Sequence, residues 1–430
     1  MDLLLLAIAL FYIITNRKTE WVLTIMLALA TKLFQASKFF SAVMLIPNMY
    51  DGALVILLAL LIKYWNKRPV LYIGYKKISE YVKIFAGYLI LLVIMDLIFN
   101  DVPISSIIKT SRHWLFLLII FIIPKIKVDI LKKTLYIIMH ITIVISTIIS
   151  LEFITGINYF TETYYHNGVA RGALPSTFAL FYTMIIACKY YNMSNIKRYT
   201  YLAILIISLL ASSTRSIALA LVLGYMLCIY FCSNNKANSI AKMLIFVFIA
   251  GTAFMFTPGI KNRFEQLSAE ISSNKRSKDV EGNTTYRLAH LTERFQYLEK
   301  HPIKLLFGVG NVIEEDFPDI FYIGVYNEKL GRTDQLDTGD ITWSLVLMRL
   351  GIIGIVLFVI LILKVTMCVF KYIPQKLAIA TTAYLTAIFL IISFAGTECY
   401  RASFWIMPTI CLSIISSQYT ESKITVTHTL

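Results

Sequence analysis

Apolar runs long enough to cross a bilayer recur along this chain, and they restrict the folds it can adopt. A soluble protein must cover its core with polar surface, yet only 15% of the 430 residues are charged and the mean hydropathy is +0.72. Layered soluble domains do not need such repeated runs. The sequence therefore predicts an all-α fold, a polytopic transmembrane helical bundle of 11–13 spans. The candidate spans are roughly 2–15, 20–45, 51–62, 81–99, 113–124, 134–155, 173–191, 200–212, 217–233, 243–258, 341–364, 377–396 and 404–417.

The charge distribution predicts which ends of the spans face the cytoplasm. The net charge is +15, but residues 261–340 contain 11 Lys or Arg and 14 Asp or Glu, so the positive excess lies in the short loops. Cytoplasmic loops retain Lys and Arg, which assigns 16–18, 63–77, 125–133, 197–198, 236–242 and 371–376 to that side. The alternating set, 47–52, 100–112, 155–172, 212–216, 259–340 and 396–401, is then external. No basic patch interleaves with aromatic residues, so nucleic acid is not an expected partner.

One large external loop divides the chain into three parts. We expect an N-terminal transmembrane bundle over residues 1–258, the loop over 259–340, and C-terminal transmembrane helices with a cytoplasmic tail over 341–430. Ser and Asn cluster near 272–284, which suggests a mobile segment there. Thr284 is a candidate helix N-cap, and Pro302 ends the predicted helix. Four apolar residues in between recur at helical spacing, namely Leu288, Leu291, Phe295 and Leu298. The pattern predicts an amphipathic helix on the membrane surface with a basic flank.

Sequence motifs of the common enzyme classes are absent. There is no nucleotide-binding glycine loop, HExxH or GxSxG, and none of the six cysteines forms a CxxC pair, so we expect neither a metal site nor a cofactor. The remaining polar signal is a set of externally placed arginines, Arg171, Arg215, Arg287 and Arg294. Arginine in or beside a span is energetically costly, so it is expected to be functional or paired. Its planar fork also matches phosphate oxygens.

Each candidate residue also has a purely structural interpretation. Arg215 can cap a helical hairpin or pair with Asp340 or Glu398, and Arg171 can anchor the chain at the interface. Arg287 and Arg294 can be the solvated flank of the loop helix. Asp340 can cap the following span.

Other ionisable residues leave similar alternatives open. His301 precedes a proline at a helix end, where histidine is more often structural. Asp96 and His140 lie inside predicted spans, where ionisable residues mark proton relays, but each stands alone.

Four segments resemble motifs of the O-antigen polymerase and O-antigen ligase family of bacterial envelope glycosyltransferases. In chain order they are Arg171–Pro175 before a span, Ser213–Ser216 opening a span, Arg287 followed by His301 and the Gly308-Val309-Gly310 turn, and Asp340–Trp343 at the exit of the long loop. The match covers about 170–360. Ligases of this family tend to carry a His-Asn pair where this chain has Asp340-Ile341, a departure that favours a polymerase.

The resemblance implies a GT-C-like membrane enzyme of the bacterial inner membrane with its large loop in the periplasm. Its substrates would be polyprenyl-diphosphate-linked oligosaccharides, and a chain-length regulator protein is a further candidate partner. Arg215, Arg287 and Asp340 would be catalytic, the arginines stabilising the diphosphate leaving group and the carboxylate accepting a proton. Arg171, Arg294, His301, Gly308 and Gly310 would bind substrate.

Three other functions remain alternatives, one of which is a scaffold or sensor subunit. A ligase of the same family would transfer the finished glycan to another acceptor. A flippase for lipid-linked oligosaccharides would have a similar number of spans, but we find no internal repeat and the roughly 80-residue loop is unneeded for transport.

Overall fold

The computed structural model is nearly all-α, as predicted. It describes residues 2–34, 37–38, 49–68, 75–158, 160–161, 163–166, 169–172, 176–187, 190–212, 215–233, 235, 237–238, 240–241, 243–245, 284–324, 326–327, 330–336, 341–372, 375–390, 392–394, 396 and 403–428. The mobile segment predicted near 272–284 lies almost wholly outside these residues.

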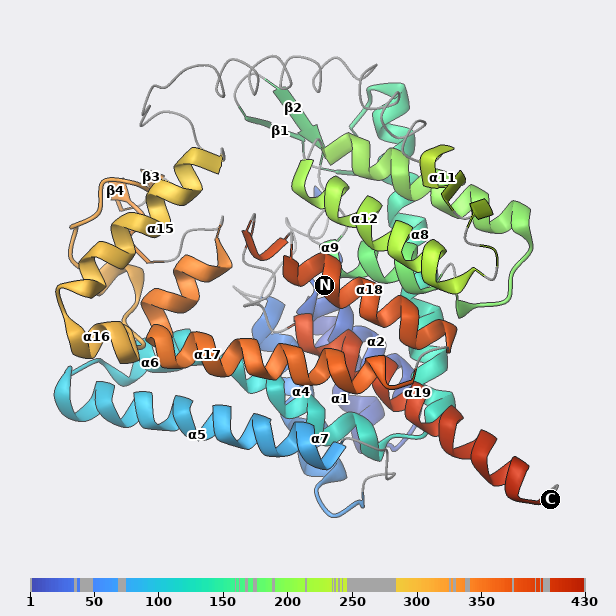
Figure 1. Ribbon diagram of the computed structural model, residues 1–430, viewed down its shortest axis with the longest axis horizontal. Coiled ribbons are helices and arrows are strands. Elements are labelled where there is room, and N and C mark those ends of the chain that lie inside the picture. Colours follow the sequence, from blue (N-terminus) through green and yellow to red (C-terminus); the bar gives the residue numbers. More distant parts are fainter. Residues whose placement is uncertain are drawn as a thin grey trace.

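Most helices follow the predicted spans in order (Figure 1). The helix predicted over 20–45 instead ends at Ala30, just before Lys32 takes a positive φ of 52°, and the span predicted over 113–124 is divided into three short helices. The first half of the chain contains α1 (Asp2–Ile14), α2 (Thr19–Ala30), α4 (Met49–Tyr64), α5 (Tyr75–Phe99), α6 (Ile104–Ser111), η1 (Trp114–Leu118), α7 (Ile119–Ile122), η2 (Ile123–Lys125) and α8 (Val128–Thr155). The second half contains α9 (Thr177–Phe181), the π-helical turn η3 (Tyr182–Ala187), α11 (Asn195–Ser212), α12 (Arg215–Cys232), α15 (Thr284–Glu299), α16 (Pro302–Phe307), η4 (Glu314–Asp316), α17 (Thr342–Phe370), α18 (Lys376–Leu390), η5 (Ile392–Phe394) and α19 (Ser403–His428).

Two short antiparallel hairpins complete the described structure. Strand β1 (Thr163–His166) pairs with β2 (Val169–Gly172), and β3 (Tyr326–Asn327) pairs with β4 (Arg332–Thr333). Both hairpins lie in segments that the sequence places on the external side.

Three of the described helices are long and apolar enough to cross a bilayer, namely Lys76–Phe99, Val128–Thr155 and Thr342–Phe370. The bent pair Ile104–Ser111 and Trp114–Lys125 would be a fourth. Shorter apolar helices of 10–17 residues are Asp2–Ile14, Thr19–Ala30, Thr177–Ala187, Ser216–Cys232 and Lys376–Leu390. The helical membrane bundle is thus confirmed, whereas the number of 11–13 spans stays a prediction, because several candidate spans include residues outside the described ranges.

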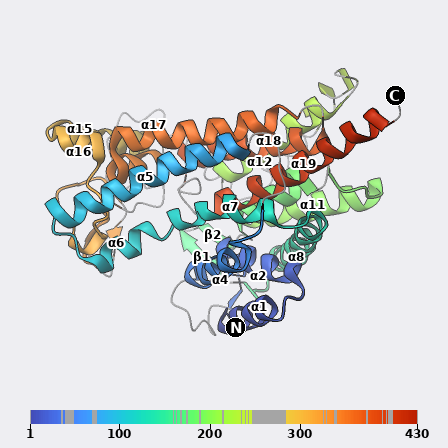
Figure 2. The same ribbon diagram turned by 90° about the horizontal axis from the view of Figure 1, so that it is seen from below.

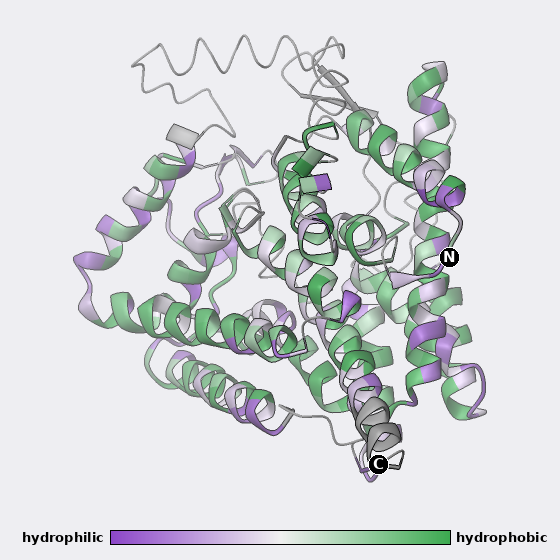
Figure 3. Ribbon diagram, turned by 45° about the vertical axis from the view of Figure 1, so that its right-hand side comes forward, coloured by the Kyte–Doolittle hydropathy of each residue, from purple (hydrophilic) through white to green (hydrophobic). Residues whose placement is uncertain are grey.

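Aromatic side chains join distant segments in the core of the bundle. Trp114 of η1 packs edge-on against Phe85 of α5 at 5.2 Å and against Phe358 of α17 at 5.9 Å between ring centroids. Phe358 in turn meets the buried Trp405 of α19 at 6.1 Å. Edge-to-face pairs of this kind add to the stabilisation from burial alone. Apolar residues accordingly dominate the helices of the bundle in Figure 3.

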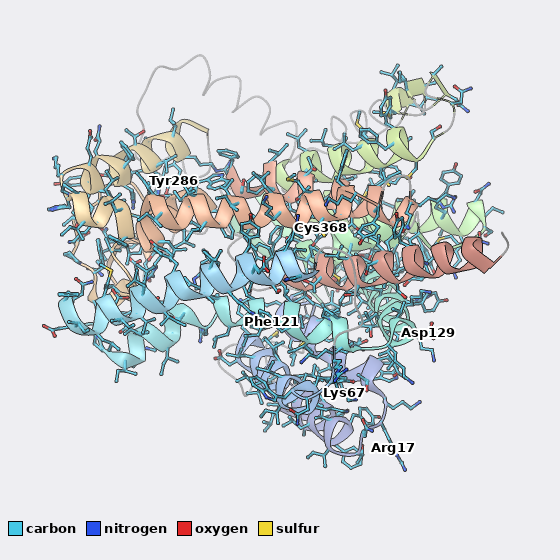
Figure 4. The ribbon with its side chains drawn as sticks, turned by 60° about the horizontal axis from the view of Figure 1, so that its bottom comes forward. Arg17, Lys67, Phe121, Asp129, Tyr286 and Cys368 are labelled. Carbon is cyan, nitrogen blue, oxygen red and sulfur yellow. The ribbon has the colours of Figure 1, made fainter. Side chains whose placement is uncertain are left out.

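The loops predicted to be cytoplasmic lie together in the fold. Lys63 Nζ donates to the carbonyl of Ile13 at 3.3 Å, and Lys125 Nζ donates to the carbonyls of Tyr64 and Trp65 at 3.0 and 3.1 Å. Figure 4 shows Arg17, Lys67 and Asp129 on one side of the structure, away from Tyr286 of α15.

The loops predicted to be external are joined to one another in the same way. Arg112 forms an ion pair with Asp51 at 3.2 Å, and Ser106 donates to Asp316 of the long loop at 3.2 Å. These contacts join loops of the same predicted side to one another. This is the arrangement that the predicted topology requires.

Helices α5 and α17 lie side by side along one face of the molecule (Figures 1 and 2). Helix α17 is broken at Gly351, which has φ +63° and ψ −170°. Its first two turns pack against α15 and α16, and the rest of the helix packs beside α5. The break therefore sits where the long loop meets the membrane helices.

Candidate active site at the junction of the loop and the broken helix

Residues 284–336 fold into a compact unit, here called the loop subdomain, that packs against the start of α17. Its apolar core is separate from that of the bundle and consists of Leu298, Val309, Phe317, Phe321 and Leu336 with Leu347 and Met348 of α17. Since α17 contributes to this core, the loop subdomain is docked on the bundle through buried contacts. The prediction that the loop is a structured element is confirmed for this part of it.

A buried glutamine organises the loop subdomain. The Gln335 side chain donates to Asp319 Oδ1 at 2.9 Å and to the carbonyls of Phe321 and Thr333 at 3.1 and 2.8 Å. Its carbonyl oxygen accepts the backbone N–H groups of Ile320 and Phe321 at 3.0 and 2.7 Å. These bonds provide hydrogen-bond partners for backbone N–H and C=O groups of the loop.

Arg294, predicted to bind substrate, is instead enclosed within the loop subdomain. Its side chain is fully buried, lies over the ring of Phe321 at 4.3 Å and forms an ion pair with Glu293 at 2.8 Å. It also donates to the carbonyls of Ile323 and, at 3.3 Å, Asp334. Burial lowers the pKa of this guanidinium to about 10, so it stays protonated at neutral pH. These contacts make Arg294 a structural cation, and its predicted contact with substrate stays untested.

The two faces of α15 differ from the sequence prediction. Leu288 and Phe295 are 65% and 42% exposed, whereas His290, Arg294 and Leu298 are almost fully buried. The interpretation of Arg294 as a solvated flank was wrong. The helix turns its polar stripe inward because loop carbonyls supply acceptors there, and it leaves part of its apolar stripe on the surface.

The glycine turn, residues 307–311, fits into the break of α17. Gly308 has φ +80° and ψ −172°, and a Cβ at this position would lie 2.6 Å from the backbone carbon and oxygen of Arg349. A Cβ on Gly351 would lie 2.4 Å from the carbonyl oxygen of Leu306 and 2.5 Å from the nitrogen of Gly308. Both glycines occupy a backbone region that is essentially restricted to glycine. Their contact brings two backbones closer together than any side chain would permit.

Hydrogen bonds from two directions satisfy the carbonyls that the break frees. Val309 N donates to the carbonyl of Met348 at 2.7 Å, and Tyr88 of α5 donates its hydroxyl to the carbonyl of Leu350 at 2.5 Å. Freed backbone groups at membrane depth are tolerated only when protein or water supplies new partners. The turn and α5 supply them here, so Gly308 has a structural role in addition to any contact with substrate.

Asp96 of α5 holds the end of the same turn. Its carboxylate accepts the backbone N–H of Asn311 at 2.8 Å, the side-chain amide of Asn311 at 2.7 Å and that of Asn100 at 3.1 Å. Thr110 of α6 donates to the Asn311 side chain at 3.0 Å. Gly310, with φ +79°, is required because a Cβ there would lie 1.9 Å from Asp96 Oδ1. These donors identify Asp96 as the anchor of the loop and give no support to a proton relay.

A second polar contact links α15 to the first turn of α17. The Ser344 hydroxyl lies 3.0 Å from Nδ1 of His290, and both side chains are about 1% exposed. Burial, together with the charge of Arg294, lowers the pKa of His290 to about 3, so the imidazole is neutral at pH 7. Its Nε2 is buried and has no hydrogen-bond partner.

The remaining predicted residues of the loop subdomain have different surroundings. Arg287 is half-buried on α15, three residues before His290, and its Nε is buried without a hydrogen-bond partner. His301 is exposed, stands before Pro302 at the start of α16 and packs its ring against Tyr297 at 5.0 Å. Its position agrees with the structural interpretation of a histidine at a helix end.

Three predicted residues belong to other segments. Arg171 lies on β2 opposite Tyr164, and Arg215 is the first residue of α12, but the side chains of both lie outside the described parts. Asp340 lies outside the described residues altogether, one position before the residue that precedes α17. The structure therefore unites Arg287, the glycine turn and the start of α17. The contribution of Arg171, Arg215 and Asp340 stays a prediction.

Comparison with protein families gives a match to part of the chain. Residues 200–359 match the family model described as O-antigen ligase. The match supports the resemblance of this stretch to the O-antigen polymerase and ligase family. It runs from α11 through the loop subdomain to the first half of α17 and includes Arg215, Arg287, Asp340 and the glycine turn. Arg171 lies before it. No curated protein matches the chain.

The family domain supports a coarse statement about activity. Enzymes of this family are glycosyltransferase-like and handle O-antigen-type glycans, acting as ligases or polymerases. The chain is thus a membrane protein, and residues 200–359 are similar to the domain of that enzyme family. The junction described above lies inside that domain, which makes it the candidate active site.

Sequence reasoning did not assign a role to several residues of this junction. Asn311 and Gly351 are common residue types in unremarkable contexts, and Ser344 lies in an apolar run. His290 had a signal, since it stands at spacings of three and four from Arg287 and Arg294. Its burial against Ser344 depends on docking of the loop, which local spacing does not encode.

Proposed function

We propose that this protein is a surface-polysaccharide polymerase of the O-antigen type. It transfers a growing glycan from a polyprenyl diphosphate carrier to a sugar hydroxyl of the next lipid-linked repeat unit, at the outer face of the bacterial inner membrane. The observation that carries the proposal is the arginine helix α15 docked on the start of α17, inside the matched family domain. There Arg287 keeps a buried Nε without a hydrogen-bond partner.

The chemistry of this transfer suits an arginine site. The glycan leaves a lipid diphosphate, so negative charge grows on the phosphate oxygens in the transition state. Arg287, with Arg215 at the start of α12, would stabilise that charge through bidentate hydrogen bonds in a site shielded from water. Positive charges of this kind do the work that a metal ion does elsewhere, so the proposed reaction is metal-independent.

The acceptor hydroxyl must lose a proton as it attacks. Asp340 stands two positions before α17 in the sequence and is the proposed proton acceptor. A carboxylate within hydrogen-bond reach of the attacking hydroxyl can serve as the general base. Arg171 and the exposed His301 are proposed to contact the sugars of the substrate. The polyprenyl tail would lie among the membrane helices.

The distinction between a polymerase and a ligase rests on the sequence at the loop exit. Ligases of the family tend to have a His-Asn pair at the position of Asp340-Ile341, and its replacement favours the polymerase. The family model itself is described as O-antigen ligase, which makes the ligase the second candidate. A flippase has no such support, since the matched domain belongs to transferases.

Deletion of the gene, followed by gel analysis of surface glycan, tests the proposal. A polymerase mutant should retain single repeat units on the final acceptor and lose long chains. A ligase mutant should lose all glycan on the acceptor while polymer accumulates on the lipid carrier. A wild-type ladder in the deletion strain would refute both activities. Complementation with the Arg287→Ala gene tests the site, because polymer of normal length at normal protein levels would exclude a diphosphate role for α15.

A further inference from the structure

His290 has a buried nitrogen that no described residue satisfies. The side chain is 1% exposed, its Nδ1 lies 3.0 Å from Ser344 Oγ, and its Nε2 has no hydrogen-bond partner. A buried polar group without a partner costs about 1–3 kcal/mol. Such groups are rare in native proteins and call for an explanation.

The contact with Ser344 indicates which nitrogen carries the proton. A neutral imidazole has one donor and one acceptor nitrogen. If Nδ1 carried the proton, both Nδ1–H and the hydroxyl proton would need acceptors, and Ser344 Oγ can accept only the first. If the serine donates to Nδ1, one bond satisfies both groups, and the proton is placed on Nε2. The contact with Ser344 thereby favours the tautomer with an Nε2–H group, which has no acceptor among the described residues.

The surroundings of this donor favour an anion. Arg287 lies one turn before His290 on α15, and Arg294 lies one turn after it. Arg287 also keeps its Nε buried without a partner. Two guanidinium groups beside a neutral ring create a positive potential and also keep that ring unprotonated. In agreement, burial and the charge of Arg294 lower the pKa of His290 to about 3.

We propose that His290 is a further substrate-binding residue, whose Nε2–H donates to a phosphate oxygen of a prenyl diphosphate beside Arg287. This inference rests on the function proposed above and names an additional residue for it. Ser344 is the positioning residue, since it acts only by setting the tautomer and orientation of the ring. Tyr286, whose ring centroid lies 6.1 Å from that of His290, covers the site on the side of the helix start. Entry of the ligand requires displacement of such covering side chains.

Two isosteric substitutions separate the ligand contact from a structural role. In His290→Gln the side-chain amide nitrogen reaches the position of Nε2, and the contact with Ser344 is lost. In His290→Asn the amide reaches only the position of Nδ1, so the contact with Ser344 is kept and the outer donor is lost. A ligand contact predicts that Gln is the better substitute. A structural role predicts that Asn is the better one.

Binding of farnesyl diphosphate to purified full-length protein in nanodiscs measures the difference. We expect His290→Asn to weaken binding by about tenfold or more, because a hydrogen bond to a charged group contributes about 1.5–3 kcal/mol. His290→Gln should lose much less, and Ser344→Ala should fall between the two. Farnesyl monophosphate should bind more weakly to the wild type and should discriminate less among the variants.

The outcomes also distinguish this inference from the proposed function. Wild-type protein that does not bind farnesyl diphosphate would overturn both. Wild-type binding that His290→Asn retains in full would overturn the histidine contact alone. If His290→Asn is both more stable and binds more tightly than His290→Gln, His290 has a structural role. That result would also overturn the histidine contact. If His290→Asn does not fold, the test is the ¹⁵N chemical shift of His290 Nε2 in the wild-type protein. The resonance is assigned by its loss in His290→Gln, and farnesyl diphosphate must shift it if the proposal is correct.

Discussion

Replacing Gly308 with alanine should loosen the loop subdomain from the membrane helices. The backbone at Gly308, with φ +80° and ψ −172°, costs a residue with a side chain about 1–3 kcal/mol. The new methyl would also lie 2.6 Å from the carbonyl of Arg349. That backbone cannot recede freely, because it neighbours the Leu350 carbonyl that holds Tyr88. Overpacking adds about another 1–3 kcal/mol, so the total loss is about 4 kcal/mol.

Gly87 provides a matched control in the middle of α5. A Cβ there meets nothing within 4 Å, and its backbone is helical. The change Gly87→Ala should therefore be neutral or stabilise the helix by up to about 1 kcal/mol. The same Gly→Ala change is thus expected to lower stability at Gly308 and to maintain or raise it at Gly87.

Thermal unfolding of the purified proteins, followed by tryptophan fluorescence, checks this prediction. Trp343 in the first turn of α17 reports on the junction, since its indole N–H donates to Ser393 at 3.1 Å. Limited proteolysis reports separately on opening of the loop. We expect Gly308→Ala to unfold several degrees lower and to be cleaved faster in residues 284–336. Equal unfolding temperatures for Gly308→Ala and Gly87→Ala would refute the argument that the two backbones must touch.

Four further outcomes are expected. Arg287→Lys keeps the charge but loses the planar fork, so polymer on a glycan gel should largely disappear at normal protein levels; a normal ladder would contradict this. Asp340→Asn should bind farnesyl diphosphate normally but turn over slowly in a polymerisation assay, and near-normal turnover would exclude it as the base. The His290 pKa of about 3 lies below the unfolded value of 6.5, so its stabilisation is complete above pH 6.5 and declines as the pH falls. The free energy of unfolding, measured by chemical denaturation, should fall by about 1.4 kcal/mol between pH 7.5 and 5.5. His290→Gln should not show this part of the pH dependence. Purified protein should polymerise lipid-linked repeat units in excess chelator, and activity that disappears there and returns with magnesium would show that a metal takes part.

Local sequence signals predicted the helices and their ends well. Thr284 begins α15 and Pro302 begins α16, at the positions that an N-cap residue and a helix-breaking proline indicate. Gly308 and Gly310 form the expected tight turn with positive φ. These features depend on neighbouring residues, which a sequence displays directly.

Long-range contacts explain what the sequence did not reveal. The inward face of α15 was missed because the acceptors of Arg294 lie about 30–40 residues further along the chain. Asp96 was noted only as an ionisable residue in a span, since its partner Asn311 is 215 residues away. The break at Gly351 occurs inside an apolar run that reads as one ordinary span. Only the docked turn makes that break stable.

The sequence predicted the location of the candidate site but not the environment of each residue in it. The spacing of Arg287 within its motif led to the helix that faces α17, and the family match covers the same segment. Burial of Arg294, in contrast, could not be inferred from its charge. Arginine is costly to bury, and only the complete set of carbonyl acceptors and the ring of Phe321 make it favourable. A residue of the same type thus has a different role seven positions further along one helix.

The way in which the loop subdomain is attached also determines where it is free to move. Its attachment is strongest beyond the C-terminal end of α15, where the glycine turn bonds to Met348 and Asp96. Pulling the turn away would leave the Met348 carbonyl without a partner beside the membrane core, which is costly. Nearer the start of α15, a hydrogen bond between His290 and Ser344 joins it to α17. A substrate that replaces packing around Arg287 and His290 would therefore displace the start of α15 while the glycine turn stays in place. The arginine helix would then pivot about a fixed base, and the diphosphate would remain close to the start of α17.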